Sequence, residues 1–422
     1  MSFRNGVLTG LVAFLVCTGG AFGSSELGAA KLKEIANRAT QTPVSATGSL
    51  QSLADYLTKP SGDELEKVRS IYEWITQNIV YDVPGFEAGV YPDQGAEAVL
   101  KRRTAVCSGY ARLFEALAAK SGVEAKEVIG SSRTAGHTME PGVEQKPDHA
   151  WTAVKINGQW RLMDCTWAAG YIDSQGRFVR NRCEFYFLTP PERFIYDHFP
   201  EDTRWQLLEE PMEREQYQGL VYLRPAFFEH GLRLVSHTKG VIRNNCCFNM
   251  SFGAPDNVLL SAQVIKGGRK DEASSLFLQR DGQALKLSTA FAAPGSYTLR
   301  LFAKKATGEQ LYDWAADYTV EVEPSPDSSP GFPIALSTFS EKKVSLAEPL
   351  VGKLRAGETV KFKLTAPGAQ AVAVVVEGKW SSLARNGDVF EGEVIAKGQG
   401  LQVAARYQGS ESYYVLLKYA VS

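Results

Sequence analysis

Three residues in the first half of the sequence have the side chains that thiol chemistry needs, namely Cys107, His149 and Asp164. The thiolate of a cysteine is the nucleophile, and an ordinary cysteine is mostly protonated at neutral pH. A histidine beside the sulfur favours the thiolate, and a carboxylate bound to that histidine fixes its tautomer and stabilises its charged form. These residues therefore predict a site in which Cys107 attacks, His149 transfers protons and Asp164 orients His149.

A helix is expected to present Cys107 in its first turn. Apolar residues recur at helical spacing just after the cysteine, at Tyr110, Leu113, Phe114 and Leu117. Ser121 and Gly122 then form a typical C-terminal stop. In the first turn of a helix, backbone N–H groups without helical partners favour negative charge, which would promote the thiolate of Cys107.

A β-hairpin is expected to bring His149 and Asp164 together. Segments 149–156 and 159–166 flank an Asn-Gly pair at 157–158, which is the strongest short signal for a two-residue hairpin loop. In this register His149 and Asp164 are diagonal neighbours on one face of the hairpin, roughly 7–8 Å apart at the backbone. Their side chains can bridge that gap with a hydrogen bond.

Other elements are expected around this core. A capping box at Ser61 and Glu64 predicts the start of a helix before the cysteine helix. Residues 125–129 predict a strand, residues 130–147 a loop, and residues 185–188 a further strand.

The texture of the sequence changes after about residue 210. Alternation at 258–264, 297–303 and 318–322 is typical of a β-sandwich, and a run rich in Pro and Ser at 324–330 predicts a linker. The 422 residues therefore divide into a leader (1–23), a catalytic domain (24–210), a β-sandwich domain (211–323), a linker (324–333) and a second small β domain (334–422).

Composition and the N-terminus restrict the class of protein. Lys and Arg total 46 against 47 for Asp and Glu, so the charge balance predicts no nucleic-acid partner. No spacing of Cys and His indicates a metal site, and no cofactor is expected. Arg4, a short apolar run and the small-x-small pattern of Ala21-Phe22-Gly23 predict a secretory leader, hence an exported protein without stable membrane insertion once the leader is cleaved.

Five cysteines follow the predicted leader, and this odd number leaves at least one thiol outside an intrachain disulfide. The hairpin register places Cys165 on the face opposite Asp164, so Cys165 is not expected to be the nucleophile. Pairing of Cys165 with Cys183 is left open. Cys246 and Cys247 are direct neighbours, and because a bridge between neighbours is strained, we expect separate roles for them.

The motifs C-S-G-Y-A at 107–111, H-A-W at 149–151 and D-C-T-W at 164–167 resemble those of the transglutaminase-like superfamily, in its kyphoscoliosis peptidase branch. Similar segments also occur at 74–82, 185–188, 190–191, 198–200 and 205–208. The resemblance covers about residues 53–210. His198 belongs to one of these segments, and its distance in sequence from the other residues favours a structural role.

The resemblance implies an α+β, papain-like fold in which the cysteine helix packs on an antiparallel sheet, followed by two small all-β, immunoglobulin-like sandwich domains. It also implies Cys107 as nucleophile, His149 as general base and acid, and Asp164 as the orienting residue. The thioester intermediate needs an oxyanion hole. Its donors are expected to be the N–H of Cys107 and an upstream side chain, for which Gln94 is the candidate.

The leading hypothesis is an exported cysteine hydrolase, a peptidase or amidase, that acts on a protein or peptide while the β domains position the substrate. A protein-crosslinking transglutaminase, which passes the thioester to an amine, is the alternative enzyme. A third reading is a non-catalytic binding or assembly protein, whose Cys107 would react no faster than an ordinary thiol. The sequence predicts neither the substrate nor the oligomeric state.

Overall fold

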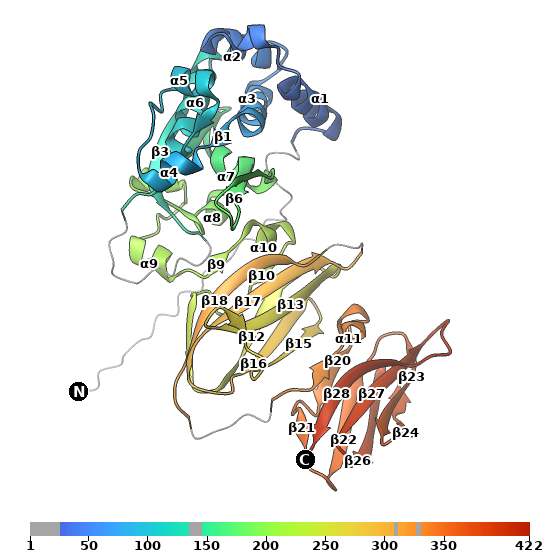
Figure 1. The fold of residues 1–422 in the computed structure, drawn as a ribbon. Coiled ribbons are helices and arrows are strands. Elements are labelled where there is room, and N and C mark those ends of the chain that lie inside the picture. Colours follow the sequence, from blue (N-terminus) through green and yellow to red (C-terminus); the bar gives the residue numbers. More distant parts are fainter. Residues whose placement is uncertain (1–25, 135–145, 308–310, 326–330) are drawn as a thin grey trace, which may run out of the picture.

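The computed structural model describes residues 26–134, 146–307, 311–325 and 331–422. The predicted leader, most of the predicted loop 130–147 and part of the predicted linker lie outside these ranges. Figure 1 shows three successive parts, of which the first combines helices with a sheet and the other two consist mainly of strands. Within the described ranges no helix is long and apolar enough to cross a bilayer.

The first part places helices against one antiparallel sheet. Its main helices are α1 (Ala29–Thr40), α2 (Leu50–Thr58), α3 (Glu64–Asn78), α4 (Val83–Ala88), α5 (Ala96–Arg102) and α6 (Cys107–Lys120). The strand order is β5-β4-β3-β8, with bounds Gln159–Met163, His149–Ile156, Ala125–Ser132 and His198–Pro200. Helix α6 packs on β3 and β4, as the α+β fold class predicted.

Helix α6 forms where the apolar spacing predicted it. Leu113, Phe114 and Leu117 are fully buried in the core of the first part. The helix ends at Ser121, and Gly122 adopts a φ of 73°, a left-handed conformation that glycine accepts without steric cost. The packing of this apolar face therefore fixes where the first turn, with Cys107, lies.

The hairpin also has the predicted turn and register. Asn157 and Gly158 have φ values of 51° and 79°, as a two-residue type I′ loop requires. Ile156 pairs with Gln159, and the pairing continues in register to Thr152 and Met163.

Two predicted element boundaries are wrong. The strand expected to reach residue 166 ends at Met163, because the next residue, Asp164, caps a short helix, α7 (Cys165–Ala169). Helix α3 is capped by Asp63 rather than by Ser61, since the carboxylate of Asp63 accepts the N–H of Glu66.

Two further local predictions are wrong. The loop expected from residue 130 starts later, because β3 continues to Ser132 and pairs there with β8. Residues 185–188 form no strand, and Glu184–Tyr186 is instead a 3₁₀ turn. Aromatic rings in this segment face different neighbours instead of alternating between two faces: Phe185 stacks on Phe228, whereas Phe187 packs on Tyr72.

The second part, residues 221–322, is a sandwich of two sheets around one core. Its first sheet has the order β10-β12-β16-β15, with bounds Arg233–Leu234, Cys247–Gly253, Ala284–Ala290 and Ser275–Asp281. Its second sheet has the order β11-β18-β17-β13-β14, with bounds Val241–Asn244, Asp313–Val322, Gly295–Lys305, Val258–Lys266 and Arg269–Lys270, and β9 (Tyr222–Leu223) pairs with β18. Phe252 and Leu287 from one sheet meet Leu299 and Tyr318 from the other.

The third part is a second sandwich. One sheet has the order β19-β28-β27-β23-β24, with bounds Ile334–Ala335, Tyr414–Val421, Gly400–Tyr407, Ala369–Val376 and Lys379–Ser382, and β21 (Lys353–Leu354) pairs with β28. The other has the order β20-β22-β26-β25, with bounds Ser345–Glu348, Thr359–Thr365, Val389–Ile395 and Ala384–Asn386. Phe277 of β15, in the preceding sandwich, is buried in the core of this one, where it contacts Phe339.

Gly130 lies where three strands of the first sheet approach closely, opposite His149 on β4 and Pro200 on β8. A Cβ at this position would lie 2.2 Å from the carbonyl oxygen of Phe199 and 2.5 Å from the ring of Trp151. We predict that Gly130→Ala lowers the free energy of unfolding of the first part by about 1–3 kcal/mol, the usual cost of overpacking. Urea unfolding followed by tryptophan fluorescence measures this change.

Gly62→Ala is the matched control, because the nearest atom to a Cβ there lies 3.9 Å away. Equal stability of the two variants would contradict the close approach of β3 and β8.

Candidate active site

Cys107 is the first residue of α6, and its side chain is partly exposed. The preceding residue, Val106, donates its backbone N–H to Oε1 of Gln94 at 3.1 Å. Gly109 allows this contact, because a Cβ there would lie 2.5 Å from the same oxygen. The partly exposed sulfur therefore lies at the N-terminus of α6, and Gln94 holds the residue that precedes this helix.

His149 begins β4 and contacts both other members of the predicted triad. Its Nε2 lies 2.7 Å from Oδ2 of Asp164, and its ring also forms a hydrogen bond with Cys107. The indole of Trp167 stacks on the imidazole with ring centroids 5.0 Å apart. Because Nε2 is engaged with Asp164, Nδ1 is the nitrogen left for the thiol.

Asp164 is fully buried, and its carboxylate has four hydrogen-bond partners. Oδ1 accepts the backbone N–H groups of Thr166 and Trp167, at 2.6 and 3.0 Å, as the cap of α7. Oδ2 is bound by His149 and, at 3.1 Å, by Nε2 of His198. The capping geometry therefore orients the carboxylate toward His149, a role that the predicted strand would not have supplied.

Charges within this group support one another. Burial alone would lower the pKa of His149, but the charge of Asp164 and the hydrogen bonds to Asp164 and Cys107 outweigh it and raise the pKa to about 10. Burial would raise the pKa of Asp164, but His149 and His198 hold it well below its ordinary value. The two side chains therefore form an imidazolium–carboxylate pair at neutral pH.

Other cysteines of the first part have different surroundings. Cys165 is buried in α7, and burial followed by the charge of Asp164 raises the pKa of its thiol well above the ordinary value. Burial likewise raises the pKa of Cys183 to about 12. Neither is in a disulfide. Their raised pKa values disfavour the thiolates, so Cys107 is the better placed nucleophile.

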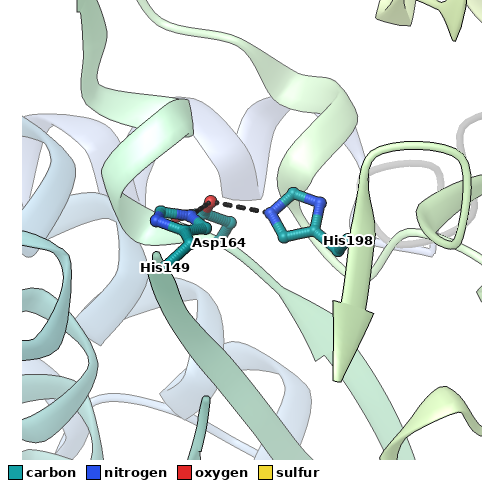
Figure 2. A group of neighbouring side chains, drawn as sticks. All are labelled: His149, Asp164 and His198. Carbon is teal, nitrogen blue, oxygen red and sulfur yellow. Dashed lines mark hydrogen bonds and ion pairs between the residues drawn. The ribbon is translucent and has the colours of Figure 1, made fainter. Parts of the chain in front are cut away.

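His198 is a site residue that the sequence analysis did not place at the site. Figure 2 shows its ring on the other side of the Asp164 carboxylate from His149. The only signals in the sequence are the short family-like segment 198–200 and the acidic residue before it, Asp197. The ligand atoms of His149, Asp164 and His198 lie within 4.8 Å of one another. Since these atoms are already hydrogen-bonded, we interpret the group as a hydrogen-bond chain.

Gln94 lies beside the cysteine turn, where an oxyanion donor is needed. Its side chain is buried, with Oε1 engaged by Val106 and Nε2 donating to the carbonyl of Pro92 at 2.8 Å. A carboxamide nitrogen has two hydrogens, so one donor is left for a substrate oxygen. Its catalytic role stays a prediction.

Two family models match the chain. Residues 51–165 match the transglutaminase-like superfamily, and residues 214–333 match the KY-like, immunoglobulin-like domain. The kyphoscoliosis peptidase of Mus musculus is 31% identical over 331 residues, which cover 74% of this chain and 48% of the relative. The kyphoscoliosis peptidase of Homo sapiens is 31% identical over 284 residues, covering 66% and 41%.

Hillarin of Drosophila melanogaster is 29% identical over 195 residues, covering 42% of this chain and 23% of the relative. The chain thus spans less than half the length of these relatives. The immunoglobulin-like match follows the transglutaminase-like match, which is the order expected from the sequence. The chain belongs to the transglutaminase-like superfamily, as a relative of the kyphoscoliosis peptidases in which a KY-like, immunoglobulin-like domain follows the core.

Proposed function

We propose that the chain is a cysteine peptidase that acts through Cys107, His149 and Asp164 and a thioester intermediate. The observation that carries the proposal is the position of His149, which is buried and hydrogen-bonded to both Cys107 and Asp164. A charged imidazole in this place stabilises the thiolate and holds a proton ready for a leaving amine. The similarity to two mammalian kyphoscoliosis peptidases supports a protein or peptide substrate.

The reaction proceeds in two halves. The thiolate of Cys107 adds to the substrate carbonyl, the C–N bond breaks, and the amine leaves with the proton from His149. Water then gives a proton to His149 and adds to the thioester, which releases the carboxylic acid and restores the thiolate. The backbone N–H of Cys107 and Nε2 of Gln94 are the proposed donors to the oxyanion in both halves.

The remaining parts of the chain complete the proposal. The two β-sandwiches position a macromolecular substrate, and the predicted leader directs the protein out of the cytoplasm.

The proposed triad determines how the rate of alkylation of Cys107 by iodoacetamide depends on pH. His149, with its pKa of about 10, stays positively charged through neutral pH. We therefore expect alkylation to be fast at pH values below the ordinary thiol pKa of about 8.5, and this fast reaction to be lost in His149→Ala. Mass spectrometry of the labelled peptide identifies the site.

His230→Ala is the matched control, since His230 also binds a carboxylate, Asp313, at 2.9 Å, but in the second part of the chain. It should leave the pH profile unchanged. A rate that rises only near the ordinary thiol pKa of about 8.5, equally in wild type and His149→Ala, would refute the peptidase proposal.

Substitutions at Gln94 test its role as an oxyanion donor. Gln94→Glu keeps an oxygen that accepts the N–H of Val106 but loses the amide hydrogens that serve the oxyanion and the carbonyl of Pro92, so we expect kcat to fall by about 10²–10³. Gln94→Ala also loses the acceptor, and should unfold at lower urea concentration as well. Wild-type kcat in Gln94→Glu would exclude Gln94 from the oxyanion hole.

A further inference from the structure

His198, at the start of β8, lies between two carboxylates in the interior of the first part. Its Nε2 is 3.1 Å from Oδ2 of Asp164, and its Nδ1 is 2.6 Å from Oδ1 of Asp197. Its side chain has no exposed surface. Asp197 is held in turn by the hydroxyl of Tyr186, which donates to Oδ2 at 3.0 Å.

These contacts determine the protonation of the ring. An ionised carboxylate only accepts hydrogen bonds, and a neutral imidazole has a single N–H. A neutral His198 would therefore turn a lone pair toward Asp164 or Asp197. An imidazolium donates to both carboxylates, so it is the form that the geometry of His198 requires.

Aromatic rings enclose His198 on its other sides. Phe194 stacks on it with centroids 4.0 Å apart, and Trp151 and Trp167 lie at 5.0 and 4.6 Å. Ring faces at such distances attract a cation, and the cage excludes water. The titratable groups around the ring are Asp164 and Asp197, by hydrogen bond, and His149 and Tyr186, with centroids at 5.4 and 5.9 Å.

We propose that His198 is a positioning residue, a buried imidazolium that anchors Asp164 against His149 and extends the triad to a chain from Cys107 to Asp197. The role rests on the proposed peptidase function, but the charge of His198 does not. Burial alone would lower the pKa of His198. The charge of Asp197 and the hydrogen bonds to both carboxylates outweigh this effect, so the pKa is raised. The contacts with both carboxylates and the raised pKa favour the cation, which is lost as the pH rises through this raised pKa.

The test combines a spectroscopic and a kinetic measurement on the full chain. Nitrogen NMR of ¹⁵N-histidine-labelled protein should show both nitrogens of His198 protonated at pH 7.5, and Asp197→Asn should shift its titration to lower pH. His198→Gln keeps a hydrogen-bond donor near Asp164 but removes the positive charge. We expect kcat to fall about 10–100-fold, as is typical when the partner of an orienting group is lost. KM should stay unchanged. His230→Gln is the control.

A single protonated nitrogen on His198 at pH 7.5 would overturn the proposal even if the peptidase function stands. Wild-type kcat at every pH in both His198→Gln and Asp197→Asn would also overturn it. Failure of the peptidase function would instead appear in the alkylation profile of Cys107, which is measured independently.

A separate observation concerns Cys246 and Cys247, which lie where β12 begins. Their sulfur atoms are 3.3 Å apart, and Cys247 is exposed. Oδ1 of Asn244 accepts both backbone N–H groups at 3.1 Å, which holds the two residues in one turn. The two thiols therefore face each other, although the sequence predicted separate roles for them.

We infer that Cys246 and Cys247 are a redox modification site, which a small disulfide such as oxidised glutathione converts to a vicinal disulfide. One protein thiolate attacks the small disulfide and forms a mixed disulfide, and the second displaces the remaining thiol. The two protein sulfurs are oxidised, the small disulfide is reduced to two thiols, and these take up the two protons. Neighbouring Cα atoms lie only about 3.8 Å apart, below the usual disulfide range, so the bond is strained and easily reduced.

The test is to equilibrate the full chain with oxidised glutathione and map the thiols after alkylation. Cleavage after Arg243 and Lys266 releases a peptide with only these two cysteines. We expect it to lose two hydrogens and carry no glutathione, whereas Cys246→Ser should carry one glutathione. A wild-type peptide that stays reduced, or that carries glutathione on both sulfurs, would overturn the inference.

Discussion

The buried carboxylate of Asp164 is the constraint on which the arrangement of the first part depends. An ionised carboxylate without water is strongly destabilising unless its oxygens are hydrogen-bonded or paired with charge. The four hydrogen-bond partners of Asp164 belong to α7, β4 and β8 or lie at their ends. The carboxylate is therefore compensated only when all three elements pack around it. The requirement for charge compensation thus coincides with the geometry that a thiol site needs.

The central strand β3 makes this convergence possible. It pairs with β4 on one side and β8 on the other, so it sets the spacing between the strands that carry His149 and His198. Gly130 has no side chain, so the neighbouring strands can lie close to β3 at this position. Helix α6, packed on β3 and β4, brings Cys107 to the same end of the sheet. Small changes in the packing of β3 would consequently act on every member of the site at once.

The sequence predicted those features that short-range patterns determine. An Asn-Gly pair fixed the register of the hairpin, and apolar spacing located α6, so the contact of His149 with Asp164 and the place of Cys107 could be inferred. Capping of α7 by Asp164 was missed, because alternation gave no sign that the strand stops at Met163. His198 was missed because it lies 34 residues from Asp164 on a strand of three residues, too short to show a period.

Phe277 links the two sandwiches, although they follow each other as separate parts along the chain. The ring lies on a strand of the first sandwich, yet it fills the core of the second, where Phe332 also stacks on it. A fragment cut off before the third part would expose this ring to water, and the third part on its own would contain a cavity of its size. Separating the two sandwiches would therefore remove a buried aromatic ring from the core of the second one, so the two are not packed independently.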